Sequence, residues 1–148
     1  MKSLYHEQVL AIGSYFGQLN ELYSQWAKRH GLTYNKVAIF YTLHHQEWGT
    51  QSQVCREWGI SKQTLSTICK EMEREGYISY DVPHADKREK LMRLTAKGRD
   101  VIGPHMEELE TIENNSLDAI GNNRIESMLD TMHRFLVHFS EESAKFEN

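Results

Sequence analysis

Apolar residues recur at helical spacing along the first part of the chain. Between Tyr5 and Trp26 they fall three and four positions apart, as on one face of an amphipathic helix. The members of this stripe are Val9, Ile12, Phe16, Leu19, Tyr23 and Trp26. His30-Gly31 predicts the end of that helix, and a second, short and buried helix is expected from Leu32-Thr33 to about His45.

Two further short helices are predicted around a tight turn. Thr50 is placed to cap a third helix over Gln51–Trp58, which Gly59 ends. Ser61 is placed to cap a fourth helix that runs to about Glu75. Its apolar stripe is Leu65, Ile68, Cys69 and Met72, so the outward residues are Lys62, Gln63, Ser66, Thr67 and Lys70. This pattern indicates a helix-turn-helix.

The next segment changes from helical to strand periodicity. Gly76 stops the fourth helix, and Tyr77–Tyr80 has the aromatic and β-branched content of a strand. Residues 81–86 have turn chemistry, and residues 90–94 alternate polar with apolar. The sequence therefore predicts a mostly α fold with a small β-hairpin wing, a winged helix-turn-helix.

The remainder of the chain is predicted to form two long helices. Thr95 can cap the first of them, and interruptions are expected at Gly103-Pro104 and at Gly121-Asn122-Asn123. Pro104 lacks a backbone donor, so we expect either a kink or a helix that restarts with Pro104 in its first turn. Residues 1–148 are expected to form one domain.

Composition and charge narrow the class of protein. The chain has 148 residues, 39% of them hydrophobic and 26% charged, and no apolar run long enough to span a membrane. With no signal-peptide pattern either, a cytoplasmic protein without a membrane partner is expected. The formal charge of -4 argues against nucleic acid, but residues 61–99 carry nine Lys/Arg against six Asp/Glu, whereas residues 100–148 carry three against eleven. This asymmetry fits a protein that turns one face to DNA, and equally a solvated acidic helix.

The fourth helix carries the candidate DNA contacts. The second helix of a helix-turn-helix enters the major groove. Lys62 and Lys70 are expected to contact phosphate, and Gln63 pairs best with adenine. The full set of candidates on this helix is Ser61, Lys62, Gln63, Thr64, Ser66, Thr67 and Lys70. Any solvent-exposed helix contains such residues. What favours DNA binding is that this helix follows a tight turn and comes directly before a β-hairpin.

The hairpin tip adds a second group of candidates. Lys87 and Arg88 are expected to contact DNA, since an arginine on a wing can enter the narrow, negative minor groove. Asp86 is expected to structure the wing by accepting backbone N–H groups or by pairing with Arg88. A solvated charged turn is the alternative.

The motifs together resemble the MarR (multiple antibiotic resistance regulator) family over about residues 32–98. They are Leu32-Thr33, Val54, Gly59-Ile60-Ser61, Thr64, Gly76-Tyr77-Ile78, Asp86-Lys87-Arg88 and Leu94-Thr95-Ala96-Lys97-Gly98. The resemblance implies a transcriptional regulator, by expectation a repressor, that binds a pseudo-palindromic DNA operator as a homodimer. Residues 1–31 and 100–148 would then be dimerisation helices around a DNA-binding region at 32–99, with half-sites ~34–36 Å apart. Thr67, Lys70 and Tyr80 depart from the residues common in the family, so base preference does not carry over.

Many members of that family release DNA when they bind a small aromatic molecule. Aromatic residues of the first two helices are candidates for such an effector pocket, although aromatics at helical spacing also build cores. They are Tyr15, Phe16, Tyr23, Trp26, Phe40 and Tyr41. An effector would then change the spacing of the two recognition helices in the dimer.

Redox sensing, metal sensing and catalysis have less support in the sequence. Cys55 and Cys69 fit buried, inert thiols better than a redox switch, and the eight histidines show no metal-ligand spacing. A redox-responsive or metal-responsive regulator therefore stays an alternative, as does a winged-helix interaction module without DNA affinity. No nucleophile-base pair or ligand cluster indicates an enzyme, and no cofactor is expected.

Overall fold

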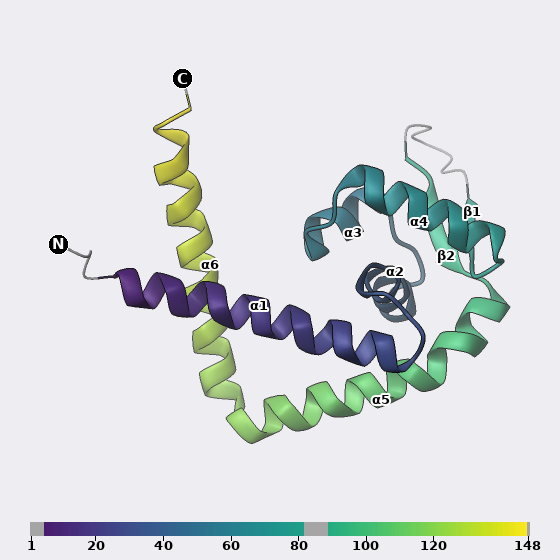
Figure 1. The fold of residues 1–148 in the computed structure, drawn as a ribbon, viewed down its shortest axis with the longest axis horizontal. Coiled ribbons are helices and arrows are strands. Elements are labelled where there is room, and N and C mark those ends of the chain that lie inside the picture. Colours follow the sequence, from purple (N-terminus) through teal and green to yellow (C-terminus); the bar gives the residue numbers. More distant parts are fainter. Residues whose placement is uncertain (1–4, 82–88, 148) are drawn as a thin grey trace. The chain divides into compact units, whose positions relative to one another are not determined.

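The computed structural model describes residues 5–81 and 89–147. In these residues the chain forms α1 (His6–Arg29), α2 (Tyr34–His45), α3 (Gln51–Trp58), α4 (Lys62–Arg74), β1 (Ile78–Asp81), β2 (Leu91–Leu94), α5 (Ala96–Ile120) and α6 (Asn122–Ala144) (Figure 1). The strands pair antiparallel, with Ile78 opposite Leu94 and Tyr80 opposite Met92. The mostly helical winged helix-turn-helix is confirmed.

Local capping chemistry fixes where the short helices begin. The side-chain oxygens of Thr33, Thr50 and Ser61 each accept the backbone N–H three residues ahead, at 3.2, 3.1 and 3.2 Å. Such caps satisfy N–H groups that have no partner inside the helix. Gly59 ends α3 at φ 66°, a conformation that glycine adopts without steric cost. The predicted caps at Thr50 and Ser61 are therefore confirmed.

The expected interruption at Gly103-Pro104 is wrong, because α5 stays helical from Ala96 to Ile120 with Pro104 inside it, while a kink at Pro104 stays a prediction. A proline usually excludes the helical conformation from the residue before it by a clash with that residue's Cβ. Gly103 has no Cβ, and this removes part of the clash. The helix thus passes the proline, and it does not restart there. The second expected interruption is present: Gly121 has φ 94° and separates α5 from α6.

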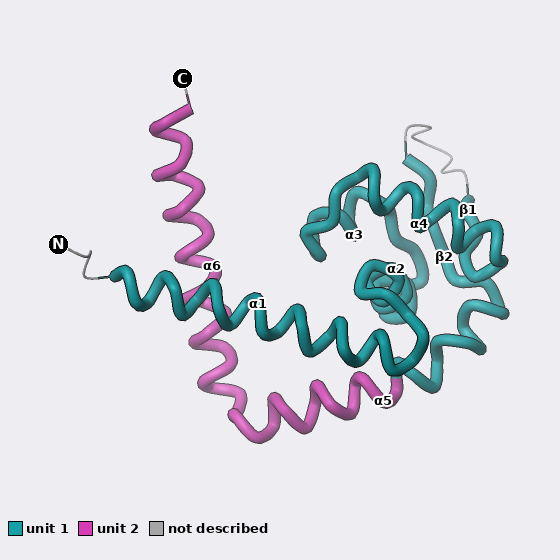
Figure 2. The backbone as a smooth tube through the Cα atoms, viewed as in Figure 1, with its two compact units in different colours: residues 1–106 teal, residues 107–148 magenta. Residues whose placement is uncertain are grey.

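The chain divides into two compact units, residues 1–106 and residues 107–148 (Figure 2). The first unit holds an apolar core in which α2 contributes most of the buried side chains, among them Val37, Ile39 and Phe40. α4 contributes Leu65, Cys69 and Met72, and the hairpin contributes Ile78, Met92 and Leu94. The core therefore fixes α4 and the wing strands against one central helix.

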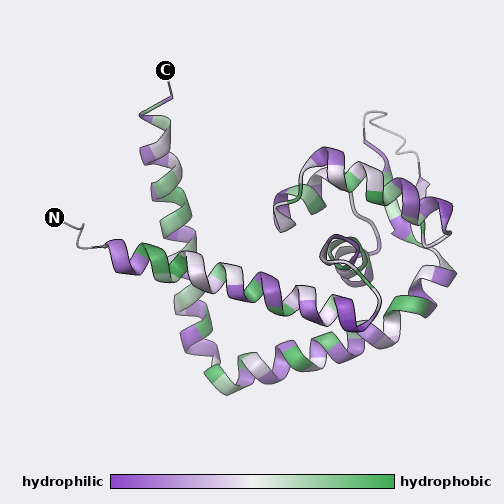
Figure 3. Cartoon of the chain, viewed as in Figure 1, coloured by the Kyte–Doolittle hydropathy of each residue, from purple (hydrophilic) through white to green (hydrophobic). Residues whose placement is uncertain are grey.

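The second unit consists of the end of α5 and the whole of α6. No residue of α6 is buried, although the helix has a regular apolar stripe. Hydrophobic segments recur along its ribbon in Figure 3, and Met128, Leu129, Leu136 and Phe139 are each more than half exposed. This stripe is left without a partner inside the second unit.

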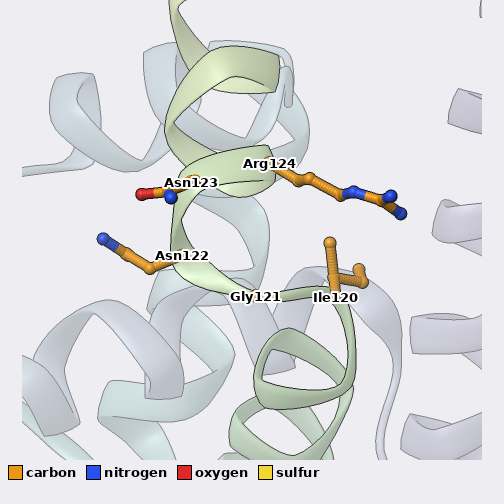
Figure 4. Close-up of a pocket in the computed structure, with 5 residues that line it drawn as sticks. All are labelled: Ile120, Gly121, Asn122, Asn123 and Arg124. Carbon is orange, nitrogen blue, oxygen red and sulfur yellow. The ribbon is translucent and has the colours of Figure 1, made fainter.

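The turn between α5 and α6 forms an open hollow of about 360 Å³. Five consecutive residues line it, and Figure 4 shows Asn122 and Asn123 directed away from Ile120 and Arg124. Binding sites for small molecules combine apolar walls with polar groups that converge. Because these side chains diverge, we assign no ligand to this hollow.

Candidate nucleic-acid interface

The α4 helix presents most of the predicted DNA contacts on its solvent side. Exposed side chains and one half-buried side chain, Ser66, make up the set. The exposed members are Ser61, Lys62, Gln63, Thr64, Thr67 and Lys70. Leu65, Cys69 and Met72 form the buried stripe of the helix, and Lys62 lies in line with this stripe but is exposed at its first turn. The structure thus brings the helical candidates together on one exposed element, while their contact with DNA stays a prediction.

The hydroxyl groups of this set differ in the hydrogen bonds that they can still offer to another molecule. Ser61 Oγ accepts the Thr64 N–H at 3.2 Å and donates its own proton to Thr64 Oγ1 at 2.8 Å. Thr67 donates its proton to the Gln63 carbonyl at 3.0 Å. Ser61 is therefore engaged as a helix cap, and Thr67 offers only an acceptor, whereas Thr64 keeps a proton to donate. Lys62, Gln63 and Lys70 make no side-chain hydrogen bond with the described part of the chain.

The C-terminal end of α4 is tied to the start of α5. The Thr95 hydroxyl donates to the Gly76 carbonyl at 2.6 Å, and Lys97 Nζ donates to the Glu75 carbonyl at 2.7 Å. Lys97 Nζ also lies 4.9 Å from the ring centroid of Tyr77. These contacts satisfy carbonyls that a helix leaves unpaired at its end. The Leu94–Gly98 motif therefore fixes the C-terminal end of α4.

Gly98 completes this junction through a close backbone approach. A Cβ at this position would lie 2.2 Å from the Tyr77 carbonyl oxygen, and the Gly98 N–H donates to Thr95 Oγ1 at 3.0 Å. Only a residue without a side chain fits there unless the backbone shifts. Thr95 thus supplies the hydroxyl that binds the Gly76 carbonyl, and Gly98 leaves room for the Tyr77 carbonyl.

The base of the wing is attached to the start of α3. Gly49 and Met92 exchange two backbone hydrogen bonds, at 3.0 and 2.8 Å, and Gln51 Nε2 donates to the Tyr80 hydroxyl at 2.9 Å. Glu89 accepts the Ser52 N–H at 3.1 Å, and hydrogen bonding by Ser52 lowers the pKa of the Glu89 carboxyl below its ordinary value. The wing residues predicted from the sequence, Asp86, Lys87 and Arg88, lie outside the described residues.

Two cations near the wing base were not among the predicted contacts. Arg93 is exposed, with its guanidinium 5.0 Å from the Trp48 ring, and Lys90 is exposed, with Nζ 5.6 Å from the Tyr80 ring. An aromatic face attracts and orients a cation. The alternating pattern of residues 90–94 predicted both cations on a strand, but it does not show that Arg93 lies against Trp48, 45 positions earlier in the sequence.

The two cysteines lie in different environments. Cys69 is fully buried, with Sγ 3.6 Å from the Met92 sulfur, and burial raises the pKa of its thiol to about 11. Cys55 is half-buried. A redox switch requires an accessible thiolate at neutral pH. The environment of Cys69 therefore favours packing over reactivity.

The six candidates for an effector pocket fall into three environments. Tyr15 and Phe16 are exposed on α1. Trp26 and Phe40 are buried, and their rings contact those of His30 and Tyr77. Tyr23 and Tyr41 both contact the ring of Trp58, at centroid distances of 6.4 and 5.5 Å. The structure therefore does not gather the six into one site.

A different aromatic group forms around the last residue of α3. The Trp58 cluster consists of Tyr23, Tyr34, Tyr41 and Trp58, all of them half-buried. The ring of Tyr34 lies 5.7 Å from that of Trp58, and burial raises the pKa of its hydroxyl. The sequence interpretation missed Tyr34 and Trp58 because each stands at a helix end, and spacing within one helix does not show a contact among three.

In residues 5–81 and 89–147, no group of three or more His, Cys, Asp or Glu side chains is arranged to hold a metal ion. Over the same residues, no helix combines the length and apolar character needed to cross a membrane.

Comparison with protein families identifies relatives of this chain. Residues 30–89 match the sequence model of the MarR family. The HTH-type transcriptional regulator Hpr of Bacillus cytotoxicus is 28% identical over 95 residues, which cover 64% of this chain and 51% of that protein. Hpr of Geobacillus thermodenitrificans is 26% identical over 92 residues, which cover 62% and 46%. The chain thus spans about half the length of these curated relatives.

Solved structures share the fold over nearly the whole chain. NMB1585, a MarR family regulator from Neisseria meningitidis, has a TM-score of 0.84 at 22% identity. The match covers 93% of this chain and 97% of that one. NadR in complex with 4-hydroxyphenylacetate has a TM-score of 0.76 at 16% identity, with 91% and 96% covered. Reduced AbfR bound to DNA has a TM-score of 0.66 at 19% identity, with 92% and 94% covered.

Proposed function

We propose that this chain, whose residues 30–89 match the MarR family model, is a transcriptional regulator that binds a pseudo-palindromic DNA operator as a homodimer and represses transcription. The observation that carries this proposal is the exposed polar face of α4, which a buried stripe and a fixed C-terminal end hold in place. A rigid, polar helix of this kind fits the major groove. AbfR, a structural neighbour, has been crystallised bound to DNA.

Individual contacts follow from the chemistry of the side chains. Lys62 and Lys70 contact phosphate, and Gln63 reads a base edge. Thr64, Ser66 and Thr67 supply shorter hydrogen-bonding groups, while Ser61 acts through its cap. Lys87 and Arg88 are proposed to contact DNA from the wing, with Asp86 structuring it.

Dimerisation is proposed through the terminal helices, residues 1–31 and 100–148. α1 exposes several large apolar side chains, Val9, Leu10, Phe16, Leu19 and Leu22, each at least half exposed. The stripe of α6 is exposed to a similar extent. Contiguous apolar surface of this kind marks an interface between proteins, and a two-fold dimer would present two recognition helices to one operator.

The DNA-binding proposal is tested by fluorescence anisotropy with genomic fragments, including the region upstream of the protein's own gene. Replacing Lys62 with Ala is expected to weaken binding to all sequences and to reduce the salt slope by about 1. The Gln63→Ala substitution should cost about 1–3 kcal/mol on the selected fragment and less on unrelated DNA. Lys145→Ala removes an equal charge just after α6, where Lys145 pairs with Glu142, and is the matched control once sedimentation velocity shows an unchanged mass. The absence of selective binding to any fragment would contradict the proposal, and the absence of all binding at low salt would favour an interaction module without DNA affinity.

A small aromatic effector is a second proposal, which the Trp58 cluster favours. This cluster presents four half-buried rings from α1, α2 and α3, and aromatic rings stack on one another in offset or edge-to-face geometry. NadR, a structural neighbour, binds 4-hydroxyphenylacetate. An effector here would change the spacing of the two recognition helices in the dimer.

The effector proposal is tested by thermal melting and operator binding with a panel of aromatic acids. A compound that raises the melting temperature and weakens DNA binding in the original protein should lose both effects in the Trp58→Leu variant. Tyr15→Leu, which alters an exposed aromatic residue of α1, is the control and should respond as the original protein does. No response to any aromatic acid would remove the support for this site.

A further inference from the structure

One part-buried ionic contact joins α2 directly to the recognition helix. Lys36, in the first turn of α2, places Nζ 3.0 Å from Glu71 Oε1 and 3.7 Å from Glu75 Oε2. The Lys36 side chain is 22% exposed, and those of Glu71 and Glu75 are 39% and 35% exposed. The hydrogen bond from Lys36 lowers the pKa of the Glu71 carboxyl, which favours its charged form.

The position of this contact on α4 matters for the residues that face DNA. Nine residues separate Lys62 from Glu71, and at ~100° per residue they make about two and a half turns, so Glu71 lies roughly opposite Lys62 on the helix. Glu75 is one further turn along the same side. Thr64 and Thr67, seven and four positions before Glu71, lie on the same side of the helix as Glu71. Because a helix turns as a rigid body, a contact that holds Glu71 sets the direction of the side chains all around α4, Lys62 and Gln63 included.

We propose that Lys36 is a positioning residue for DNA recognition: by holding Glu71 and Glu75, it sets the rotation of α4 about its axis and so the direction of Lys62 and Gln63. This inference rests on the proposed function. Thr95 and Lys97 already fix the end of α4 from the α5 side, through backbone carbonyls. Lys36 holds the same half of the helix from α2, through side chains.

Two explanations of the role of Glu71, positioning of α4 and repulsion of the DNA phosphates, predict opposite effects of removing its charge. Removing the negative charge of Glu71 should by itself strengthen attraction to the phosphate backbone. Loss of the ionic contact lets α4 rotate, so that the outward residues meet DNA less often in the right direction. The Glu71→Gln substitution should therefore weaken operator binding if Lys36 positions the helix, and tighten it if only charge matters.

The experiment compares four variants with the original protein by anisotropy on a fragment that the original protein binds selectively. Glu71→Gln and Lys36→Gln are expected to weaken binding about fivefold, the upper range for a partly exposed ion pair. The double variant Lys36→Glu with Glu71→Lys should recover most of the affinity, since it restores the pair with its signs exchanged. Glu73→Gln removes an equal charge from an exposed position of α4, with no ion pair to any described residue, and should bind as well as or better than the original protein. Tighter binding by Glu71→Gln, or no recovery in the double variant, would overturn the proposal.

Amide hydrogen exchange tests the same contact without DNA. If Lys36 holds α4, amides within Lys62–Arg74 should exchange faster in Glu71→Gln than in Glu73→Gln at the same pH and temperature. Equal exchange in the two variants would overturn the positioning role. If the original protein binds no fragment selectively, the DNA-binding proposal fails, and the exchange rates still decide whether the contact holds the helix.

Discussion

The α4 and α6 helices have the same kind of amphipathic pattern and opposite environments. In α4 the apolar stripe is buried, with Leu65, Cys69 and Met72 fully covered by the rest of the first unit. In α6 the stripe repeats with similar regularity, and no residue of the helix is buried. Burial of apolar side chains is the main source of stability in a folded chain. The chain alone therefore stabilises α4, whereas α6 needs a second surface.

This difference shows that periodicity predicts which side of a helix is apolar but does not predict what covers it. The first unit closes its core with buried residues of α2, α4 and the hairpin. The terminal helices expose large apolar residues that one chain does not cover. We expect substitutions in the two regions to affect different properties, stability in α4 and association in α6.

The largest effect is expected from charges placed in the stripe of α6. The double substitution Leu129→Arg with Leu136→Arg should convert the dimer to monomers in sedimentation velocity, because two arginines cannot be buried without partners. Operator affinity should then fall about 100-fold or more, since one chain engages one half-site. Ser127→Arg adds a charge to the opposite side of the same helix and should leave the mass unchanged. Dimers that persist in the double variant would place the interface elsewhere.

A smaller but still large effect is expected from a cavity under α4. Leu65 has no exposed surface, and Leu65→Ala should lower the free energy of unfolding by about 3 kcal/mol in urea denaturation. Gln63→Ala, on the outer side of the same helix, should change it by less than about 0.5 kcal/mol. If the two variants unfold at the same urea concentration, the helix is not held by its stripe.

The helix caps offer a third and more moderate test. Ser61 caps α4 with its side chain, whereas the N-cap of α6 is Gly121 and has no side-chain hydrogen bond. The Ser61→Ala substitution should lower the free energy of unfolding by about 1 kcal/mol, and Ser61→Gly by only a few tenths. Chemical denaturation of both variants checks this order. A loss in Ser61→Gly equal to that in Ser61→Ala would show that flexibility, and not the missing cap, controls the result.

The smallest effect near neutral pH is expected from Tyr80, a half-buried residue of β1. Burial raises the pKa of Tyr80 to about 12 from an ordinary value of 10.0. Above pH 10 the unfolded chain therefore loses this proton while the folded chain keeps it, so stability falls as the pH rises towards 12. Urea denaturation should show a shallower alkaline loss in Tyr80→Phe than in the original protein, after a cost of about 1 kcal/mol at neutral pH for the lost Gln51 hydrogen bond. Parallel losses of stability would exclude Tyr80 as the titrating group.

Much of the fold could be predicted because its signals are local. The caps at Thr50 and Ser61 and the glycine stop at Gly59 depend on residues only a few positions apart, and the structure has them where the sequence predicted them. The interruption predicted at Pro104 is absent, since Gly103, the residue before it, has no Cβ to clash with the proline ring. Local signals were thus reliable for element boundaries except where two of them opposed each other.

The candidate site was predicted less completely, because its supporting contacts join distant residues. Lys36 meets Glu71 across 35 positions, and Glu89 reaches Ser52 across 37. No periodicity relates such residues, since their distance depends on how the helices pack. The outward residues of α4 follow from one helical stripe, whereas the residues that orient them became visible only in three dimensions.

The reading face of α4 has a consequence for how such a protein changes over evolutionary time. Lys62, Gln63 and Lys70 make no side-chain hydrogen bond with the described part of the chain, so their replacement costs the fold little. Under the proposed function, mutation at these positions alters operator preference without first requiring a compensating change in the core. Copies of the gene that arise by duplication could acquire separate sets of target promoters while they keep one scaffold.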